Sequence, residues 1–222
     1  MPTPSLNSPE TSGNDFWSKV PQPTIERLSA YLQCVRTLRE EGEKAASSAE
    51  IARRTGINAA QLRKDLSYFG EFGTPGLGYE LEALETQLAR IMGIDQERDV
   101  LLVGFGNLGR ALSSYTGFGR RGFKIVAAFD VDPEKIGHKT AHFEVFDLDK
   151  LPEINAKLGA QVGIVAVPAP NAQGAIEALA NAQVRAILNF APVAVKASDG
   201  IAVRNVDLTS QMEILSYYLR SH

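Results

Sequence analysis

The chain has 222 residues, of which 44% are hydrophobic and 22% charged, and a formal net charge of −3, values that suit one large or two modest folded domains. No apolar run approaches the ~20 residues of a membrane-spanning helix, so no membrane association is expected. A single cysteine, Cys34, excludes an intramolecular disulfide framework, and residues 1–20 lack the apolar region of a signal peptide, so we expect a cytoplasmic protein.

The first part of the chain has the element order of a winged helix-turn-helix. Residues 1–20 are rich in Ser, Thr, Pro and Asn and predict a disordered tail. Within 21–94, apolar residues at helical spacing predict a first helix that ends near Gly42. The pair Ser47 and Glu50 forms a capping-box pattern for a second helix, and Asn58 supplies the N-cap of a third. The stretch GEFGTPGLGYE (70–80) then predicts a tight hairpin, followed by a connector helix.

The third helix is amphipathic in an informative way. Leu62, Leu66 and Phe69 fall on one narrow stripe, whereas the opposite side is polar and cationic. Between 51 and 69 the cations are Arg53, Arg54, Arg63 and Lys64 against Asp65 alone, a local charge of +3. An ordinary solvated helix face would also look like this. The capped turn before the helix and the glycine-rich segment after it favour a nucleic-acid-binding face instead.

The pattern changes near residue 95. Continuous apolar runs at 100–103, 125–129, 163–167 and 186–190 alternate with helical stretches, which predicts a parallel sheet covered by helices on both faces. We therefore expect a Rossmann-type domain over 95–207. The last segment, 208–222, predicts a helix that is apolar around most of its circumference.

A glycine-rich loop opens this second domain. The sequence VGFGNLG (103–109) places Gly104, Gly106 and Gly109 between a predicted strand and a predicted helix, the context that a dinucleotide-binding loop requires. Asp130 ends the next strand 21 residues after Gly109, where a carboxylate accepts hydrogen bonds from ribose hydroxyls. Because no arginine follows closely, NAD(H) is favoured over NADP(H). A capping role for Asp130 is the alternative.

Few residues suit catalysis. His138 and His142 have a metal-compatible spacing, but their surroundings predict a loop, so we expect no metal site. Cys34 lies on the apolar side of the first helix and is expected in the core. The segments PAPN (168–171) and NFAPV (189–193) follow strands without a strong acid, base or thiol. We expect a chain that binds a dinucleotide and has no catalytic residue.

The sequence closely resembles the Rex family of redox-sensing transcriptional repressors. The matching segments cover both domains: QLRKDLSYFGEFG (61–73), GLGY (76–79), VGFGNLG (103–109), GFGRRGFKIVAAFDVDPEKIG (117–137) and NFAP (189–192). The resemblance implies a homodimer whose winged helices bind a palindromic double-stranded DNA operator. It also implies a Rossmann domain that binds NADH and NAD+, and a C-terminal helix exchanged between subunits.

The resemblance also assigns residues. It implies DNA contacts at Gln61, Arg63, Lys64, Ser67, Tyr68 and Thr74, in which either Arg63 or Lys64 reads bases or pairs with phosphates. It implies cofactor contacts at Gly104, Phe105, Gly106, Asn107, Leu108, Gly109, Asp130, Pro168, Asn189 and Phe190. Tyr115 and Asp207 correspond to switch positions. Simple packing of Tyr115 and helix capping by Asp207 are the alternatives.

Three functions remain open on the sequence. The resemblance implies a repressor that senses the NADH/NAD+ ratio and leaves its operator when NADH binds. An NAD-dependent dehydrogenase with an accessory helical domain is the second possibility. The third is a non-catalytic nucleotide-binding module whose winged helix binds protein.

Overall fold

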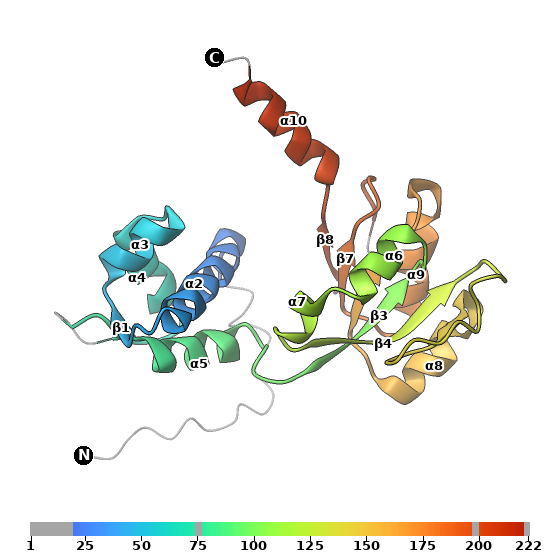
Figure 1. Cartoon of the computed structure of the whole chain (residues 1–222), viewed down its shortest axis with the longest axis horizontal. Helices are drawn as coiled ribbons and strands as arrows, with labels where there is room; N and C mark the ends of the chain where they lie inside the picture. Colours follow the sequence, from blue (N-terminus) through green and yellow to red (C-terminus); the bar gives the residue numbers. More distant parts are fainter. Residues whose placement is uncertain (1–19, 74–76, 197–199, 220–222) are drawn as a thin grey trace. The chain divides into compact units, whose positions relative to one another are not determined.

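The structure is a computed structural model that describes residues 20–73, 77–196 and 200–219 (Figure 1). Two compact units divide between Asp95 and Gln96. The predicted boundary near residue 95 lies at this division. The predicted tail at 1–20 falls outside the described residues except for Val20, which is buried and is therefore part of the folded unit.

The first unit is a small helical domain with a two-stranded sheet. Its core is formed by the apolar sides of its helices, with Leu28, Leu62 and Leu88 almost fully buried. Cys34 is also buried, as the sequence predicts. The elements in chain order are α2 (Gln22–Glu40), β1 (Ala45–Ala46), α3 (Ser48–Thr55), α4 (Ala59–Ser67), β2 (Tyr79–Glu80) and α5 (Leu81–Ile91).

The predicted helix boundaries have the expected chemistry. The Ser47 hydroxyl accepts a hydrogen bond from the Glu50 N–H, and α3 ends at Gly56 with φ 70°. Asn58 accepts a hydrogen bond from the Ala60 N–H at 2.7 Å and so caps α4. The short turn between these two helices places α4 as the second helix of a helix-turn-helix.

The predicted hairpin at 70–80 differs in its pairing. Among the described residues of this stretch, β2 pairs antiparallel with β1, which lies between α2 and α3 in the sequence. Gly73 and Gly78 nevertheless lie close together, as a reversal of the chain requires. A Cβ on Gly73 would lie 2.6 Å from the Gly78 carbonyl oxygen. The sequence pattern detected the reversal and missed the partner strand, because a two-residue strand such as Ala45–Ala46 has no periodicity to detect.

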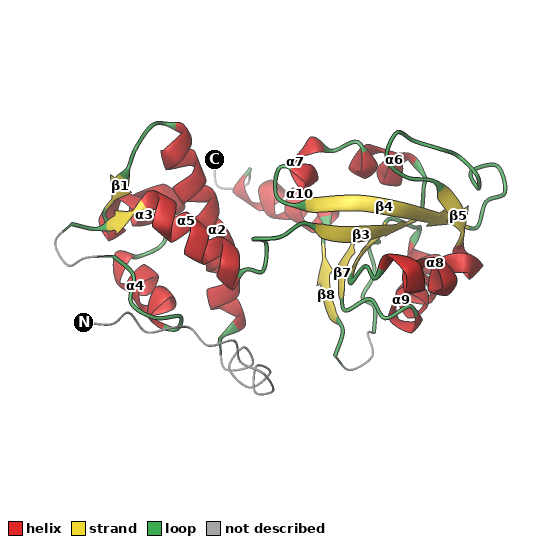
Figure 2. Cartoon of the chain, turned by 90° about the horizontal axis from the view of Figure 1, so that it is seen from below, coloured by secondary structure: helices red, strands yellow, loops and turns green. Residues whose placement is uncertain are grey.

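The second unit is built on a six-stranded parallel sheet. Its order is β5-β4-β3-β6-β7-β8, and it is covered by α6 and α7 on one face and by α8 and α9 on the other (Figure 2). This is the strand order of a Rossmann fold. The strands are β3 (Arg98–Val103), β4 (Phe123–Asp130), β5 (Val145–Asp147), β6 (Val162–Val165), β7 (Ala186–Asn189) and β8 (Ala202–Asn205). The helices are α6 (Asn107–Ser113), α7 (Thr116–Gly119), α8 (Leu151–Leu158), α9 (Ala172–Asn181) and α10 (Leu208–Tyr218).

The sequence located four of these strands and missed the two at the edges of the sheet. β5 has only three residues, and β8 is largely exposed, so neither forms a continuous apolar run. α10 follows β8 (Figure 1), and none of its residues is buried. In the part of the chain that the structure describes, no helix has the length and apolarity needed to cross a bilayer.

Candidate DNA-binding and dinucleotide-binding sites

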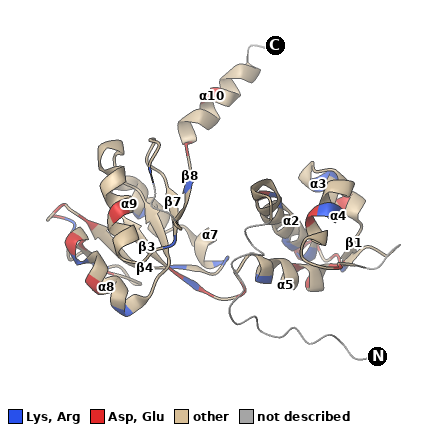
Figure 3. Cartoon of the chain, turned by 180° about the vertical axis from the view of Figure 1, so that it is seen from behind, with Lys and Arg blue, Asp and Glu red and all other residues tan. Residues whose placement is uncertain are grey.

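The predicted DNA-binding face lies on α4. Leu62 and Leu66 are buried, whereas Arg63, Lys64 and Ser67 are exposed on the other side of the helix. Figure 3 shows the cationic residues of α3 and α4 in blue. Helical periodicity therefore predicted correctly which side of α4 packs and which side is exposed.

The local charge of this region is smaller than the sequence count suggested. Arg53 and Arg54 both pair with Glu50, and Arg54 also pairs with Glu41 at 2.7 Å. Hydrogen bonds from these two arginines lower the pKa of Glu50 to about 2. The surplus of +3 expected from the sequence is thus partly neutralised by acids on α3 and at the end of α2. Among the described residues, neither Arg63 nor Lys64 is in an ion pair, and these two cations carry the remaining positive charge.

The predicted DNA contacts differ in whether their side chains are hydrogen-bonded within the domain. Arg63 donates a hydrogen bond from Nη1 to the Ser48 hydroxyl at 2.8 Å, and the Ser67 hydroxyl donates to the Lys64 carbonyl oxygen. Tyr68 is half-buried. Thr74 lies outside the described residues. Arg63 is therefore linked to the first turn of α3, whereas Lys64 extends from α4 alone.

A buried carboxylate lies on the packed side of the same helix. The Asp65 side chain has no exposed area and accepts hydrogen bonds from Thr24 Oγ1, Tyr31 OH and Gln61 Nε2. Arg27 binds it in a bidentate manner, with Nε at 2.6 Å and Nη2 at 2.8 Å. Gln61, which is expected to contact DNA, directs its amide nitrogen into this cluster. The charge count from the sequence includes Asp65 as a surface charge. Arg27 and Tyr31, four residues apart on α2, are the residues in the sequence that indicate its burial.

The cluster shifts the ionisation of its members. Burial alone would raise the pKa of the Asp65 carboxyl, but hydrogen bonds from Arg27, Gln61, Tyr31 and Thr24 outweigh it and hold that pKa below its usual range. Burial and the hydrogen bond to Asp65 raise the pKa of the Tyr31 hydroxyl well above its usual value. The cluster is thus an ionised carboxylate paired with a guanidinium, and the tyrosine is protonated near neutral pH.

The glycine loop of the second unit has the backbone geometry that the sequence predicts. Gly104 has φ 95°, and a Cβ there would lie 2.6 Å from the Ala166 carbonyl oxygen. A Cβ on Gly109 would overlap the Gly104 carbonyl oxygen, so α6 packs directly on the turn. Gly106 is different, because a Cβ there would have no neighbour within 4 Å. The backbone at Gly106 is therefore accessible to a phosphate at the start of α6.

Asp130 lies at the end of β4 beside this loop. Its Oδ2 accepts a hydrogen bond from the Phe105 N–H at 2.7 Å, and its Oδ1 accepts one from the Asp132 N–H at 3.0 Å. Lys135, which the sequence analysis overlooked, places its Nζ 3.4 Å from both carboxylate oxygens of Asp130 and 3.2 Å from Asp132. Asp130 therefore connects the glycine loop to the loop after β4. With two carboxylates and one ammonium, this group of charges has a net negative charge.

A cleft of about 850 Å³ opens at the carboxyl ends of the strands. Its walls include Gly104, Gly106, Asp130 and Pro168, which come from β3, β4 and the segment after β6. This is the point where the strand order reverses and where ligands bind in open α/β sheets. The volume is within the 300–1,000 Å³ range typical of small-molecule sites. The residues present fit a dinucleotide.

Two of the predicted cofactor residues are placed elsewhere. Asn189 has no exposed area, and its side-chain amide is hydrogen-bonded to the Ala191 backbone and to the Asn205 side chain, so it shapes the end of β7. Phe190 packs against the apolar cluster on the α6 side of the sheet. Neither residue lines the cleft. The motif NFAP therefore forms a tight backbone turn at the end of β7.

Phe105 also packs inward. Its side chain is almost fully buried, with its ring 5.5 Å from the ring of His138 and 6.0 Å from that of Phe143. Of the predicted loop contacts, Asn107 and Leu108 lie in the first turn of α6. Phe105 can offer a cofactor only its backbone, and its N–H is already directed to Asp130.

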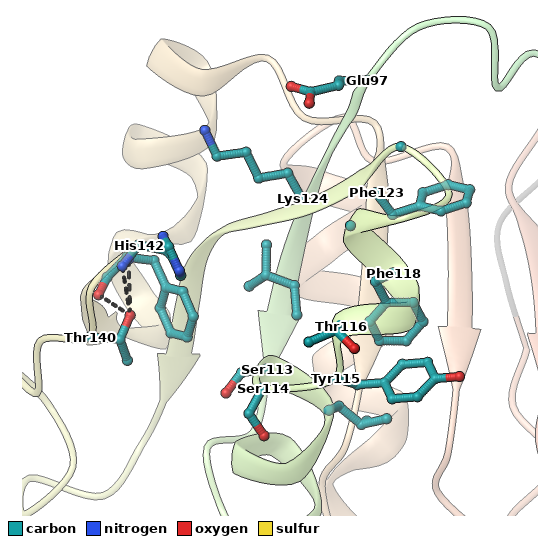
Figure 4. A pocket seen from close by; sticks show the side chains of 15 residues that line it. Glu97, Ser113, Ser114, Tyr115, Thr116, Phe118, Phe123, Lys124, Thr140 and His142 are labelled. Atoms are coloured by element: carbon teal, nitrogen blue, oxygen red, sulfur yellow. Dashed lines mark hydrogen bonds between the residues drawn. The ribbon is translucent and has the colours of Figure 1, made fainter.

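The predicted switch residues are both accessible. Tyr115 precedes α7, is 61% exposed and packs edge-on against Phe118. It stands at the rim of a second cavity of about 590 Å³, and its hydroxyl points away from Lys124 and His142 across that cavity (Figure 4). Asp207 caps α10 by accepting hydrogen bonds from the Thr209 and Ser210 N–H groups. The capping alternative for Asp207 is therefore observed.

A capped helix-turn-helix with a cationic second helix, followed by a Rossmann domain with an accessible dinucleotide loop, defines a DNA-binding regulator with a nucleotide-binding domain. Residues 19–67 match the family described as putative DNA-binding protein N-terminus, and residues 95–193 match the family described as CoA binding domain. The chain is 45% identical to the redox-sensing transcriptional repressor Rex of Carboxydothermus hydrogenoformans, over 91% of this chain and 97% of that protein. The chain belongs to the Rex family.

Other relatives agree with this assignment. The repressor named Rex 1 of Thermotoga maritima is 42% identical over 90% of this chain and 95% of its own length. Among solved structures, RSP in complex with NAD+ and operator DNA superposes with a TM-score of 0.85 at 35% identity, covering 91% of this chain and 93% of that one. RSP in complex with NADH gives a TM-score of 0.83 at 33% identity, covering 91% and 95%.

The lowered pKa of Asp65 predicts how acid changes the stability of the first unit. Because the folded pKa lies below the unfolded value of about 3.9, the stabilisation by this carboxylate is complete above that value and is lost as pH falls through the folded pKa. Asp65→Asn should reduce the free energy of unfolding near neutral pH by roughly 3 kcal/mol, the lower end for a broken buried ion pair, since part of Arg27 reaches solvent. Urea titrations followed by circular dichroism should show the two proteins converging in strong acid. A difference that stays constant from pH 7 to pH 2 would contradict the assignment.

The glycines of the loop predict two distinct defects. Gly106→Ala should leave the fold intact, because its Cβ meets open space, yet weaken NADH binding about tenfold or more by obstructing the pyrophosphate. Gly109→Ala should instead destabilise the domain by about 1–3 kcal/mol through overpacking against Gly104. NADH fluorescence titration and urea unfolding measure the two quantities separately. Equal NADH affinity of Gly106→Ala and wild type would place the pyrophosphate elsewhere.

Proposed function

We propose that this protein is a transcriptional repressor that binds an operator through α4 and leaves it when NADH occupies the cleft beside Gly106. The observation that carries the proposal is the presence, in one chain of the Rex family, of the exposed cations Arg63 and Lys64 and of an accessible dinucleotide loop. The relative RSP has been solved both with NAD+ and operator DNA and with NADH, which supports the same two ligands here.

The cofactor is proposed to be NAD(H), not NADP(H). At the end of β4, Asp130 and Asp132 share one ammonium, that of Lys135, so the corner that receives the adenosine ribose keeps a net negative charge. A 2′-phosphate would be repelled there, whereas ribose hydroxyls can donate to the carboxylate. Gly104, Gly106 and Gly109 shape the pyrophosphate site, and Pro168 forms the opposite wall of the cleft.

A homodimer is part of the proposal. On α10, Met212 is 64% exposed and Leu215 is 57% exposed. The other large apolar residues of α10 and its C-cap are exposed as well: Leu208, Ile214, Tyr217, Tyr218 and Leu219. An apolar helix of this kind requires a cover. The sheet also has an apolar hollow of about 360 Å³ on the α7 face, lined by residues such as Ile164 and Leu188. Exchange of α10 with a second copy would cover apolar surface in both subunits and give the two-fold symmetry that a palindromic operator requires.

The switch is proposed to work by linkage between the two ligands. If NADH favours a dimer arrangement that DNA does not, NADH must weaken DNA binding by the same factor by which DNA weakens NADH binding, typically about 5–150-fold. Tyr115 and Asp207 are proposed to meet across the dimer and to report the state of the cofactor. Cytoplasmic action fits a DNA target and the free thiol of Cys34.

An enzymatic function is not favoured. Relatives that are 42–45% identical over about nine-tenths of the chain are named transcriptional repressors. The cleft is lined by Asp130, Asp132, Lys135 and Asp149 as its charged residues, and these lie around the loops after β4 and β5. The segment 168–171 beyond them contributes Pro168, Pro170 and Asn171 to the wall, none of which is a strong general acid or base.

The proposal predicts that NADH releases the operator. A fluorescein-labelled palindromic duplex with a Rex-family operator should bind tightly at fixed salt, and NADH should lower its affinity about 5–150-fold, whereas NAD+ at equal concentration should not. Fluorescence anisotropy measures both. Lys64→Ala should abolish binding without changing NADH affinity, which serves as the control for folding. Operator binding that is indifferent to NADH would remove the coupling, and NADH oxidation with simple carbonyl substrates would favour a dehydrogenase.

The exposure of α10 predicts that charge on its apolar side prevents dimerisation. Leu215→Glu should raise the dimer dissociation constant about a hundredfold or more, because a carboxylate would be buried without a partner. Thr209→Glu adds the same charge on the polar side of the same helix, which Thr209 shares with Glu213 and Ser216, and should leave the dimer intact. Sedimentation velocity over a range of concentrations separates the two. A Leu215→Glu dimer as stable as wild type would show that α10 is not the interface.

A further inference from the structure

The most deeply buried charge in the first unit lies on the DNA-binding helix itself. Asp65 is adjacent to Lys64 in sequence, but its side chain has no exposed area and points into the domain, toward α2. The proposed function uses Arg63 and Lys64 and has no role for this carboxylate. A buried ion pair is usually no more stabilising than well-packed apolar residues, so its presence needs another explanation.

Apart from the exposed hydrogen bond between Arg63 and Ser48, the other contacts that hold α4 on the domain are apolar among the described residues. Leu62 and Leu66 bury the helix against the core, and the hydrophobic effect that holds them is non-directional. A small rotation or axial slide of α4 would keep both residues buried. It would displace Lys64 relative to the surface of the domain, because successive residues of a helix are 100° apart.

The hydrogen bonds to Asp65 are directional. Arg27 binds both carboxylate oxygens in a fork with fixed geometry, and Tyr31 OH at 2.8 Å and Thr24 Oγ1 at 3.1 Å approach from the same helix. These three donors occupy successive turns of α2, so they oppose both rotation and sliding of α4. Gln61 Nε2, also at 2.8 Å, completes the set from α4 itself.

We propose that Asp65 is a positioning residue for operator recognition, which fixes the rotation and axial position of α4 through Arg27, Tyr31 and Thr24. This inference rests on the proposed function, because it assumes that α4 reads an operator. Asp65 touches no base or phosphate. It determines whether Lys64 and its neighbours reach the base edges in the correct register, and so it controls specificity more than affinity for DNA in general.

The readout that separates positioning from simple stability is the ratio of two affinities. Loss of fold reduces the active fraction for every duplex equally and leaves the ratio of operator to scrambled-duplex affinity unchanged. A misplaced α4 loses base contacts, each worth about 5–150-fold in discrimination, but keeps phosphate contacts and therefore the salt dependence of binding. The ratio and the salt slope together identify the role.

The first unit offers a matched control. Glu85 on α5 pairs with Arg36 and Arg39 of α2 and has 20% of its side chain exposed, so it is another partly buried carboxylate held by arginines of the same helix. It makes no hydrogen bond to α4 among the described residues. Glu85→Gln therefore tests the loss of an ion pair within this unit without releasing α4.

The experiment measures anisotropy with an operator duplex and a scrambled duplex of equal length, at several salt concentrations, for Asp65→Asn, Thr24→Val, Tyr31→Phe and Glu85→Gln in the full chain. Asp65→Asn should lower the specificity ratio about 5–150-fold with an unchanged salt slope, and Thr24→Val and Tyr31→Phe should lower it by smaller factors. Glu85→Gln should keep the wild-type ratio. Circular dichroism reports the folded fraction, and NADH titration reports the second unit.

Two results would overturn the assignment. One is a folded Asp65→Asn protein with the wild-type ratio. The other result applies if Asp65→Asn does not fold. In that case, a wild-type ratio of operator to scrambled-duplex affinity in both Thr24→Val and Tyr31→Phe would overturn the assignment. If the wild-type protein itself fails to prefer the operator, the proposed function fails, and that outcome is distinct because it precedes any substitution.

Discussion

The cofactor cleft depends on the absence of a side chain at Gly104. This residue stands where the chain leaves β3 and where the sheet reverses its order between β3 and β6. Its carbonyl oxygen lies in contact with Gly109, and its own Cα faces the Ala166 carbonyl oxygen, so neither position tolerates a Cβ. Because α6 can pack this closely, the helix begins directly after Gly106, which lines the cleft and remains open to a ligand. Asp130 then fixes the loop through the Phe105 N–H.

The two units form their binding surfaces from different parts of the chain. In the second unit, backbone groups provide the binding surface, and side chains such as Phe105 and Asn189 are buried to hold that backbone in place. In the first unit, side chains of α4 provide the surface, and the helix carrying them must be held from behind. Asp65 does this with charge-assisted hydrogen bonds, whereas Leu62 and Leu66 supply the burial. Both sites are therefore held in place by side chains that are buried behind the exposed surface.

The sequence predicted the order of elements well because its signals were local. Ser47 and Asn58 mark helix starts through hydrogen bonds that span three residues or fewer, and Gly56 marks a helix end through its positive φ. The glycines of the loop at 103–109 likewise lie within a seven-residue window. The misses required distant partners. The strand Ala45–Ala46 pairs with residues more than thirty positions away, and Asp65 looks like a surface charge until its partners Arg27 and Tyr31 on α2 are known. Counting charges also failed, because Glu41 and Glu50 neutralise arginines that the count treated as free.

These features also explain why dimerisation and sensing belong together. A single helix-turn-helix reads one half-site, so tight binding requires two recognition helices at a fixed separation. Asp65 can fix α4 only within its own unit; in the proposed dimer, the interface that covers α10 would set the separation between the two copies. Asp207 caps α10 where that helix leaves the Rossmann domain, so a displacement at the cleft end of the sheet would reach the interface through one short segment after β8. A redox-controlled repressor needs a recognition helix that is fixed within its own unit and a variable separation between the two recognition helices of the proposed dimer. The cofactor can then change DNA affinity without altering which bases are read.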